Sequence, residues 1–484
     1  MLFNSLQYAL FLPVVVIVYF ALPQRFRWMF LLAVSYYFYM CWNAGYALLM
    51  LLSTAVTYAA GRLMHGASGK KRRTLYLVSS LVINLGILFL FKYFNFFNGT
   101  IAELAGLLGA DYQPLKLSLL LPVGISFYTF QALGYTIDVY KGKSGPEKHF
   151  GKYALFVSFF PQLAAGPIGR YESLMPQFKN MRRLDFQRIK SGLLLIAQGL
   201  VKKLVIADRL AVLVNTIYDS PEKYNGVHFA VATVFFTFQI YCDFSGYSDM
   251  AVGSARLLGY DLTVNFKRPY LSTSISDFWK RWHISLTSWF RDYIYIPLGG
   301  NRKRHLANIM AIFLISGLWH GANLTFILWG FLNGLYQIVG LKLRPYTAKL
   351  KAALKIGEDS PGLRFFKWLY TFALVCFAWI FFRADSMGDT VFILNKLFTF
   401  DSSFFANMKM AGLGMDKADL FVSFLLIALL MLYEYIQERV NLGAYLGKKP
   451  LVVRWAVYAA VFVLIIIFGV YGDANGVQFI YFQF

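Results

Sequence analysis

Charged side chains are scarce in this sequence, and acidic ones are the scarcest. Only 15% of the residues are charged, whereas 58% are hydrophobic; an ordinary soluble domain has roughly 25% charged residues. The mean hydropathy is +0.53. This composition excludes an ordinary cytosolic enzyme, a disordered chain and a secreted disulfide scaffold. We expect an all-α polytopic membrane protein that forms one bundle.

Cysteine and the common catalytic motifs are also lacking. The three cysteines, Cys41, Cys242 and Cys376, lie in or beside apolar stretches and have no CxxC spacing. A disulfide framework is therefore unsupported, and we predict no metal site. The sequence has no GxSxG, HExxH, P-loop or GxGxxG signature after a strand, which argues against phosphoryl transfer and metallohydrolase chemistry.

The charges that are present are mostly basic. Lys and Arg number 47 and Asp and Glu 24, so the formal net charge is +23. Such a balance can indicate nucleic-acid binding. In a membrane protein it favours cytosolic loops beside anionic lipid, so we expect the lipid bilayer and no nucleic acid as a partner.

Twelve apolar runs predict about 11–12 transmembrane helices, because roughly 20 apolar residues cross the hydrocarbon core. Basic loops follow the first and third runs, at Arg25 and at 70–73, whereas the turn at 42–45 is neutral. Lys448 and Lys449 precede the last run. Positive loops stay inside, so both termini are predicted to be extracytoplasmic. The runs lie near 7–22, 28–43, 45–61, 74–93, 115–137, 191–218, 227–241, 307–319, 322–341, 365–382, 418–435 and 452–470.

Three segments of the middle part depart from a simple alternation. Tyr153–Gly166 is a short apolar run between two basic segments, and it contains Pro161, so we expect a re-entrant segment. Lys202, Lys203 and Arg209 lie in an apolar run. Either their side chains snorkel to a nearby interface or the helix is broken there, or they form an electropositive funnel for an anionic substrate. Residues 261–304 combine Trp and Tyr with Lys and Arg, a pattern typical of helices at the cytosolic interface.

His320 is the leading candidate for chemistry. The basic cluster Arg302–Arg304 lies 16 residues upstream, so a helix carries His320 about 24 Å from that anchor. An ionisable residue at such depth is a functional candidate by default, and a buried imidazole favours the neutral form that a general base requires. The alternative is a structural histidine bonded to a neighbouring carbonyl group. Gly317 and Gly321 flank it and permit close approach of a helix or a substrate.

Two further polar groups are weaker candidates. His283 lies 37 residues before His320, in the aromatic and basic stretch. Asp243 and Asp249 belong to a polar patch that follows an apolar run; they either line a cavity or pair with a cation such as Arg256. Each of these signals taken alone is ambiguous.

Several ordered blocks together resemble the membrane-bound O-acyltransferase (MBOAT) family, most closely its bacterial branch of alginate O-acetyltransferase membrane subunits. The resemblance extends over nearly the whole chain. The blocks are 122–127, 165–168, 243–249, Asp277–His283, Asp292–Asn301, Gly317–Ala322 and the terminal 479–484.

This resemblance implies a ring of transmembrane helices with re-entrant segments around a tunnel, in one domain over 1–484. Its sections would be N-terminal helices at 1–137, a catalytic core at 138–345 and C-terminal helices at 346–484. His320 matches the membrane histidine of the family, and His283 matches its upstream partner. The residues expected to bind the donor or line the tunnel are Trp279, Arg281, Trp282, Trp319, Asn323, Asp243 and Asp249.

The resemblance also implies acyl transfer from a cytosolic thioester to a hydroxyl group of an exported polysaccharide or cell-wall glycan. We expect no bound cofactor, acetyl-CoA or an acyl carrier protein as donor, and a periplasmic or extracellular acetyltransferase partner that docks on the tail. The location would be the bacterial inner membrane. The alternatives are D-alanyl transfer to teichoic acid, a small-anion permease with Lys202 and Lys203 along its path, and a non-catalytic scaffold.

Overall fold

The computed structural model describes residues 1–163, 166–353, 355, 357, 360–399, 412–471 and 479–480. All regular elements of these residues are helices, which confirms the predicted all-α class. The chain divides into two compact units, the first formed by Met1–Ile196 and Tyr247–Val264 and the second by Ala197–Gly246 and Asn265–Phe484. These bounds differ from the predicted sections 1–137, 138–345 and 346–484, and the single domain stays a prediction.

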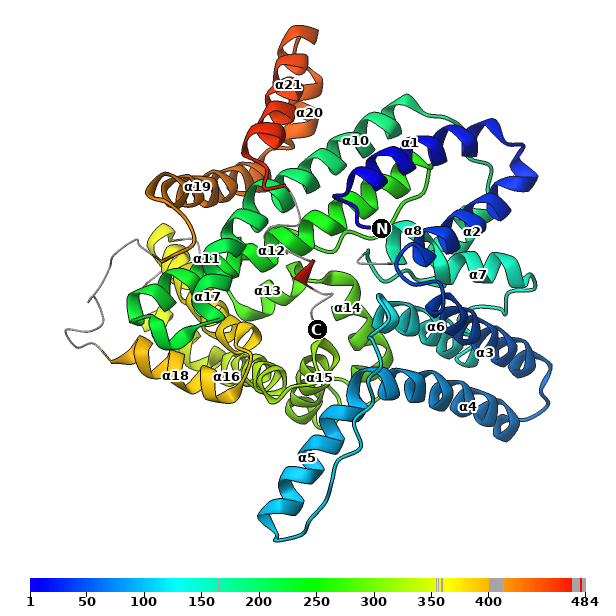
Figure 1. Ribbon diagram of the computed structural model, residues 1–484, viewed down its shortest axis with the longest axis horizontal. Helices are drawn as coiled ribbons and strands as arrows, with labels where there is room; N and C mark the ends of the chain where they lie inside the picture. The colour runs from blue at the N-terminus through cyan, green and yellow to red at the C-terminus, as the bar shows by residue number, and fades with distance from the viewer. Residues whose placement is uncertain are drawn as a thin grey trace. The chain divides into compact units, whose positions relative to one another are not determined.

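The first unit contains the N-terminal helices (Figure 1). The chain passes through α6 and α7 before the unit ends within α10, and the last turns of α12 return to it. The helices are α1 Leu6–Ala21, α2 Gln24–Met40, α3 Tyr46–Gly66, α4 Lys70–Leu88, η1 Phe89–Tyr93, α5 Phe94–Leu107, α6 Ile125–Tyr140, α7 Phe150–Ser158, α8 Phe160–Leu163, α9 Tyr171–Lys179 and α10 Phe186–Leu200.

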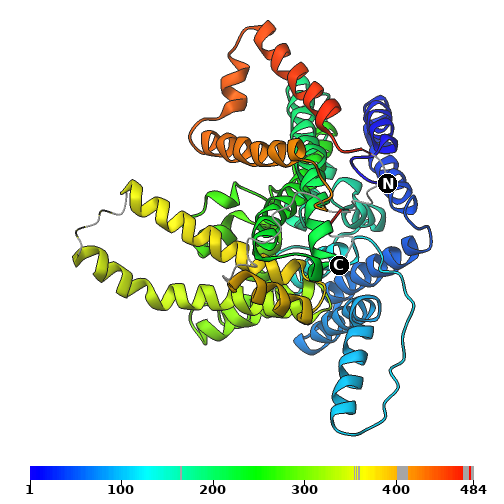
Figure 2. The ribbon, with the colours of Figure 1, turned by 60° about the vertical axis from the view of Figure 1, so that its left-hand side comes forward.

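The second unit contains the remaining helices, among which α15 and α16 pack side by side and α16 pairs with α17 (Figure 2). Its helices are η2 Val201–Ala207, α11 Asp208–Tyr218, η3 Pro221–Lys223, α12 Gly226–Leu257, η4 Pro269–Leu271, α13 Ile275–Arg281, α14 Ile284–Phe290, η5 Arg291–Tyr295, α15 His305–His320, α16 Leu324–Ala353, α17 Pro361–Arg383, α18 Met387–Phe398, α19 Lys417–Arg439, α20 Leu442–Gly447 and α21 Leu451–Phe468.

Seven of the described helices are long and apolar enough to cross a membrane, and α1 and α15 are apolar but shorter. Their outward faces are apolar too: α1 exposes Leu6, Leu10 and Ile17 while it buries Tyr8 and Leu12. A helix exposed to water would carry polar residues on its outer face, so this pattern is typical of contact with lipid. The seven are Tyr46–Gly66, Lys70–Leu107, Gly226–Leu257, Leu324–Lys349, Pro361–Arg383, Lys417–Arg439 and Leu451–Phe468.

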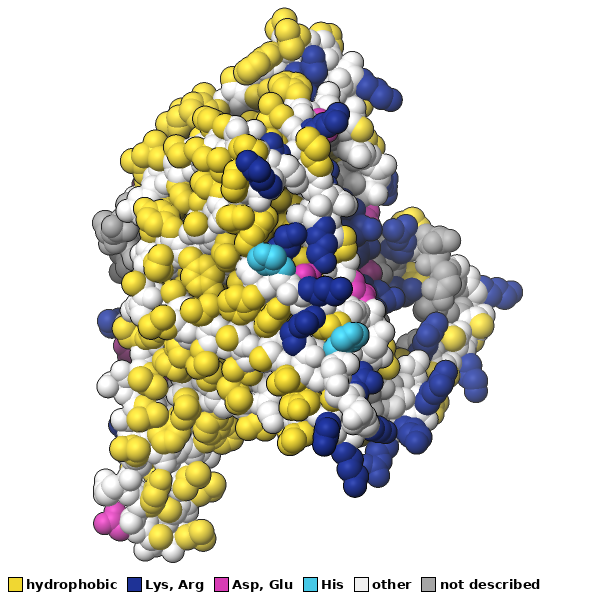
Figure 3. Space-filling view, turned by 90° about the vertical axis from the view of Figure 1, so that its right-hand side faces the viewer, with side chains coloured by type: hydrophobic (Ala, Val, Ile, Leu, Met, Phe, Trp, Pro, Cys, Tyr) yellow, Lys and Arg dark blue, Asp and Glu magenta, His cyan; other side chains and the backbone are white. Residues whose placement is uncertain are grey.

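Hydrophobic side chains cover broad areas of the face that Figure 3 shows, and many Lys and Arg side chains are exposed on the same face. Exposed basic residues of a polytopic membrane protein are typical of loops that stay in water.

Two predicted apolar helices have different limits in the structure. The run 115–137 has no helix before Gly124, and helix α6 starts only at Ile125, because Pro114 and Pro122 interrupt a helix. Gly124 has a φ of 74°, a left-handed conformation that glycine adopts without strain. The run 191–218 is helical throughout, but its middle, Val201–Ala207, is a π-helix. A π-helical turn is a local bulge in an α-helix and often lies at a functional site.

The predicted re-entrant segment folds as the short helices α7 and α8, whose residues from Tyr153 onward are buried. The helix is interrupted at Phe159, and nearby side chains form hydrogen bonds with backbone groups that the interruption leaves without a helical partner. The carbonyl oxygen of Phe156 accepts hydrogen bonds from the Nε2 atoms of Gln131 at 2.5 Å and Gln162 at 2.8 Å. Non-helical backbone is tolerated in a membrane protein under this condition. Of this predicted segment, 164–165 lie outside the described residues.

Candidate active site

The crossing of α15 and α16 places His320 at the end of a tightly packed helix pair. A Cβ atom on Gly317 would lie 2.2 Å from the carbonyl oxygen of Phe326, and one on Gly330 would lie 2.3 Å from that of Phe313. Only glycine permits this approach of the two backbones. His320 is the last residue of α15, so this contact fixes the position of its backbone.

Aromatic rings surround the imidazole of His320. The side chain is 4% exposed, and its ring centroid lies 4.9 Å from Trp319, 5.1 Å from Trp329 and 5.3 Å from Phe382, each in an edge-on arrangement. Helix α15 ends here because Gly321 has an extended backbone. The structure therefore buries His320 inside the protein, and its predicted depth in the bilayer stays a prediction.

His283 joins the short helices α13 and α14 in a backbone conformation that is unusual for histidine. Its φ is 43° and its ψ is 53°, the left-handed region that a non-glycine residue occupies at some cost. Asn265 holds the turn: its backbone oxygen accepts from Ile284 N at 2.9 Å, and its Oδ1 accepts from Ser285 N at 3.2 Å. Asn265 thereby sets the direction in which the imidazole points.

The imidazole of His283 lies among rings of the same unit. It is 1% exposed, and its centroid lies 4.8 Å from Phe244 and 6.4 Å from Phe266. His283 is outside the seven long apolar helices. Burial lowers the pKa of His283 from 6.5 to about 3, so the ring is neutral at physiological pH.

Trp319 contacts both histidines. Its centroid lies 6.1 Å from His283 and 4.9 Å from His320, so the structure brings the two predicted catalytic residues into one aromatic cluster. We refer to this cluster as the histidine chamber. It comprises His283, His320, Phe244, Phe266, Trp319, Trp329 and Phe382.

Trp279 and Trp282, predicted to line the donor path, are buried beside the chamber. Trp279 lies 5.8 Å from Trp329, and Trp282 lies 5.0 Å from Phe266. Their stretch was predicted to lie at the membrane interface, but the structure buries its aromatic rings. The turn at His283 separates two seven-residue helices, and the location of this stretch at the cytosolic interface stays a prediction.

Arg281 is engaged by acidic side chains. Its guanidinium pairs with Asp277 and Glu438, both at 3.1 Å, and Glu438 also pairs with Arg268 at 2.5 Å. Burial by itself lowers the pKa of Arg281, but the carboxylates of Asp277 and Glu438 raise it, so the pKa is raised overall. A role of Arg281 in binding donor phosphates stays a prediction, and it would require Arg281 to exchange these partners.

Asn323 performs a local structural task. Its Oδ1 accepts from Thr325 N at 3.1 Å at the start of α16, and its Nδ2 donates to the carbonyl oxygen of Asp385 at 2.9 Å. The side chain thus ties the start of α16 to the end of α17. Its predicted contact with the donor or tunnel stays a prediction.

Asp243 belongs to a buried group of charges. Lys203 Nζ lies 2.8 Å from Asp208 Oδ1 and 2.7 Å from Asp243 Oδ1, and the three side chains are at most 6% exposed. We refer to these three residues as the ionic centre. Asp249 lies in the other unit, in the final turns of α12. The predicted donor or tunnel roles of Asp243 and Asp249 stay predictions.

The ionic centre changes the interpretation of the basic residues in the π-helical segment. Lys203 neither snorkels to a surface nor presents a free charge, because two carboxylates contact it. Arg209 pairs with Asp419 and donates to the carbonyl oxygen of Phe468 at 3.0 Å. Lys202 lies over the Tyr241 ring at 5.6 Å. These contacts weaken the interpretation as an electropositive funnel.

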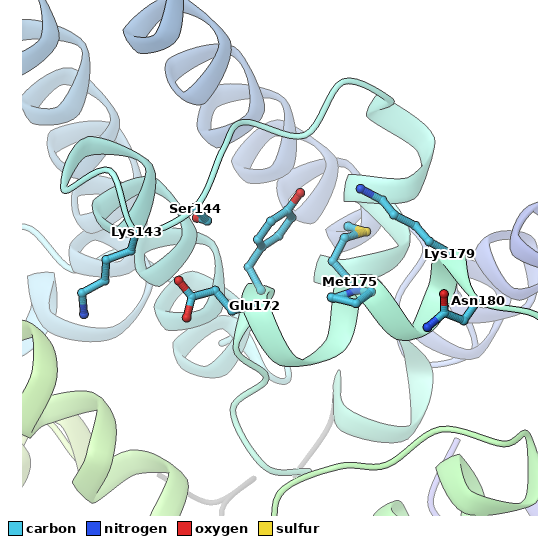
Figure 4. A pocket seen from close by; sticks show the side chains of 8 residues that line it. Lys143, Ser144, Glu172, Met175, Lys179 and Asn180 are labelled. Atoms are coloured by element: carbon cyan, nitrogen blue, oxygen red, sulfur yellow. The ribbon is translucent and has the colours of Figure 1, made fainter.

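A separate pocket of about 410 Å³ opens in the first unit. Figure 4 shows Lys143 and Lys179 on opposite sides of its lining. Lys179 pairs with Glu147 at 2.8 Å; burial acts to raise the pKa of Glu147, but this pair and hydrogen bonds lower it overall. The lining has no histidine, and Glu172 is its only carboxylate. It consists of Lys143, Ser144, Tyr171, Glu172, Met175, Pro176, Lys179 and Asn180.

Sequence reasoning did not identify Asn265 or Asp208. Asn265 is 1% exposed and Asp208 4%, and buried polar side chains of this kind hold partners in place. Asn265 lies in the aromatic and basic stretch 261–304, but nothing in that pattern distinguishes it from a surface residue. Asp208 follows Lys203 by five residues, a weak hint that the two form a pair.

Comparison with known families finds one family model that matches the middle of the chain. The model of the membrane-bound O-acyltransferase family, MBOAT, matches residues 147–383. This range includes both histidines of the chamber. The predicted N-terminal helices and the tail lie outside it.

Individual relatives extend the similarity to most of the chain. The probable alginate O-acetylase AlgI of Pseudomonas aeruginosa is 37% identical over 436 residues, which cover 89% of this chain and 81% of that protein. The peptidoglycan O-acetyltransferase of Helicobacter pylori is 35% identical over 421 residues, covering 80% and 77%. The teichoic acid D-alanyltransferase of Bacillus subtilis is 27% identical over 274 residues, covering 54% and 68%.

Proposed function

The chain belongs to the membrane-bound O-acyltransferase family, and we propose that it transfers an acetyl group from a cytosolic thioester to a hydroxyl group of an exported glycan, with His320 as the base. The observation that carries this proposal is the placement of two buried histidines in one aromatic chamber, each in ring contact with Trp319. An aromatic chamber excludes water, which would otherwise hydrolyse the thioester.

In the proposed reaction, the acceptor oxygen attacks the thioester carbonyl carbon while His320 takes the hydroxyl proton. The carbon–sulfur bond breaks, and the sulfur leaves as a thiolate that receives a proton from the imidazolium. The products are an ester and a thiol, and His320 returns to its neutral form. Acyl transfer to His320 itself, followed by transfer to the acceptor, is the alternative route.

His283 is proposed to assist as a neutral group. Because burial lowers its pKa to about 3, it does not carry a positive charge during turnover at neutral pH. A neutral imidazole can donate one hydrogen bond from its protonated nitrogen, which would stabilise negative charge that develops on the carbonyl oxygen. Asn265 would then be the residue that fixes its direction.

The donor is proposed to be acetyl-CoA, with an acyl carrier protein as the alternative. A nucleotide donor carries phosphates, and the exposed basic surface of the protein favours their approach. The acceptor class follows from the similarity to alginate and peptidoglycan O-acetylating proteins. A periplasmic or extracellular partner would complete transfer to the glycan.

The protein is proposed to lie in the bacterial inner membrane with both termini outside. The alternation of basic loops supports this orientation. A reporter fused to the C-terminus that is active only in the cytosol would refute it.

In the decisive experiment, purified protein in detergent is given labelled acetyl-CoA together with an alginate oligosaccharide that supplies the acceptor hydroxyl group. We expect His320→Ala to lower the rate of CoA release by at least about 100-fold, the lower range for loss of a general base. His65→Ala is the matched control, since His65 is exposed at the end of α3. Equal rates for wild type and His320→Ala would refute the role of His320.

The same assay separates the remaining candidates. If wild type consumes no acetyl-CoA but does consume a D-alanyl carrier protein, the function is the D-alanyl transfer found in the name of the Bacillus subtilis relative. If it transports a small anion without consuming any thioester, the permease interpretation replaces the proposal.

A further inference from the structure

The carboxyl-terminal part of the chain returns to the protein interior. Phe479 is 1% exposed and Ile480 is 3% exposed. The backbone nitrogen of Ile480 donates to Asp243 Oδ2 at 2.8 Å. The predicted docking tail therefore has two buried residues, whereas 472–478 and 481–484 lie outside the described residues.

The chain that leaves α21 is tied to the same region of the second unit. Val470 N donates to the carbonyl oxygen of Leu204, within the π-helix η2, at 2.9 Å. Arg209 Nη2 donates to the carbonyl oxygen of Phe468 at 3.0 Å. The segment after α21 is thus tied to η2 and α11 near its start, and to the ionic centre at Ile480.

Phe479, the residue before Ile480, is in ring contact with the histidine chamber. Phe479 lies beside Phe244, with ring centroids 6.0 Å apart, and Phe244 is the residue after Asp243. The Phe244 ring in turn lies 4.8 Å from His283 in an edge-on arrangement. The hydrogen bond from Ile480 therefore holds the neighbouring Phe479 ring against Phe244, and the Phe244 ring packs on His283.

We propose that Asp243 is a positioning residue that holds Phe479 and Ile480, through the N–H of Ile480, against the Phe244 side of the histidine chamber. The inference rests on the proposed function, because it assigns the reaction to that chamber. The buried Phe479 and Ile480 then support the chamber from behind its rings without touching the reacting groups, and these two residues are unavailable as a docking surface for a partner protein.

The geometry of the ionic centre supports a specific task for Asp243. Its Oδ1 contacts Lys203, and its Oδ2 contacts Ile480, so the lysine fixes the carboxylate in the orientation that receives the chain end. If the charge of Asp243 is removed, Asp208 still contacts Lys203 at 2.8 Å. Substitution of Asp243 therefore leaves one balanced ion pair, and we expect the variants to fold.

The test measures the exposure of residue 480 without any acyl donor. Ile480→Cys is introduced together with Cys41→Ser, because Cys41 is exposed, and its labelling by N-ethylmaleimide is timed in detergent. We expect Asp243→Ala to accelerate labelling about tenfold, the scale expected when a hydrogen bond to a charged group is lost. Asp243→Asn retains an oxygen acceptor and should stay closer to wild type. Asp111→Ala, at an exposed loop residue, is the matched control.

A second variant leaves the ionic centre untouched. Ile480→Pro removes the donated N–H and should lower kcat about tenfold, the same hydrogen-bond scale, without changing KM for acetyl-CoA; Ile480→Val keeps the N–H and should retain wild-type kcat. Unchanged labelling in Asp243→Ala overturns the proposal, as does equal kcat for Ile480→Pro and Ile480→Val. Failure of the proposed function would show separately, as full activity of His320→Ala with the labelling results intact.

Discussion

The ionic centre and the histidine chamber are two buried polar regions of the same unit, and they are built in opposite ways. In the ionic centre, Lys203 is in direct contact with the carboxylates of Asp208 and Asp243. In the chamber, His283 and His320 are packed against aromatic rings. In the ionic centre, opposite charges neutralise one another, whereas the chamber surrounds its two histidines with uncharged aromatic rings.

This difference follows from what each region does. An ion pair stabilises buried charges only while both signs are present, and it holds its helices in one arrangement. A base must remain neutral until it takes a proton, and apolar surroundings favour the neutral imidazole. The comparison suggests that the ionic centre serves position and that the chamber serves chemistry.

Removal of the cation from the ionic centre should have the largest effect on stability. Lys203→Met leaves two carboxylates buried against each other without their partner, and we expect a loss of about 3–5 kcal/mol, the range for breaking a buried ion pair. Thermal unfolding in detergent and the yield of folded protein measure the change.

The matched control for Lys203→Met removes all three charges at once. Lys203→Met with Asp208→Asn and Asp243→Asn has no unpaired charge and should recover much of the lost stability. If the single and the triple variant are equally unstable, packing and not charge balance explains the sensitivity of the site.

A change at the α15–α16 crossing should disturb the chamber by a smaller amount. Gly330→Ala places a Cβ atom 2.3 Å from the carbonyl oxygen of Phe313, so the helices must separate at a cost of about 1–3 kcal/mol. Gly340→Ala, in the same helix, meets no atom within 4 Å and should be neutral or slightly stabilising. Since His320 ends α15, only Gly330→Ala should also lower the rate of acyl transfer; equal rates in both variants would separate the crossing from catalysis.

The predicted effect that is smallest over a single pH unit concerns the pH dependence of stability. The pKa of His283 is about 3 in the folded protein against 6.5 as the ordinary value, so between these values the unfolded chain binds more protons. Stability should fall as the pH is lowered from 6.5 toward 3, by at most about 1.4 kcal/mol per pH unit from this residue.

Comparison with His283→Gln isolates that contribution, because carboxylates also destabilise the protein in acid. The difference in apparent Tm between wild type and His283→Gln should shrink or reverse as the pH falls below 6.5. A difference that stays constant from pH 7 to pH 4 would mean that His283 is charged or solvated in the folded protein.

The sequence predicted the class of the fold and the limits of several helices. The first run, near 7–22, corresponds to α1 at Leu6–Ala21, and the last, near 452–470, corresponds to α21 at Leu451–Phe468. Long apolar runs determine such helices locally, because backbone hydrogen bonds must be satisfied within the segment. The helix predicted over 115–137 was wrong before Ile125, because hydropathy takes no account of the prolines at 114 and 122.

The candidate site was predictable in part. His320 was identifiable because its depth is a distance along one helix, counted from Arg302–Arg304. Asn265 and Asp208 were not identifiable in this way. Asn265 acts on His283 from another turn, and Asp208 acts together with Asp243, which lies 35 residues further along the chain.

The amino-acid sequence by itself determined that this protein is a multi-pass, all-α membrane O-acyltransferase, and it identified His320 as a candidate, since composition, apolar run length and ordered motif blocks are properties of the chain. Only the tertiary structure decided which polar groups meet. It placed Trp319 between the environments of both histidines, Lys203 between two carboxylates and Ile480 on Asp243. The physical reason is that such contacts join residues on different helices, and their geometry depends on how the helices pack.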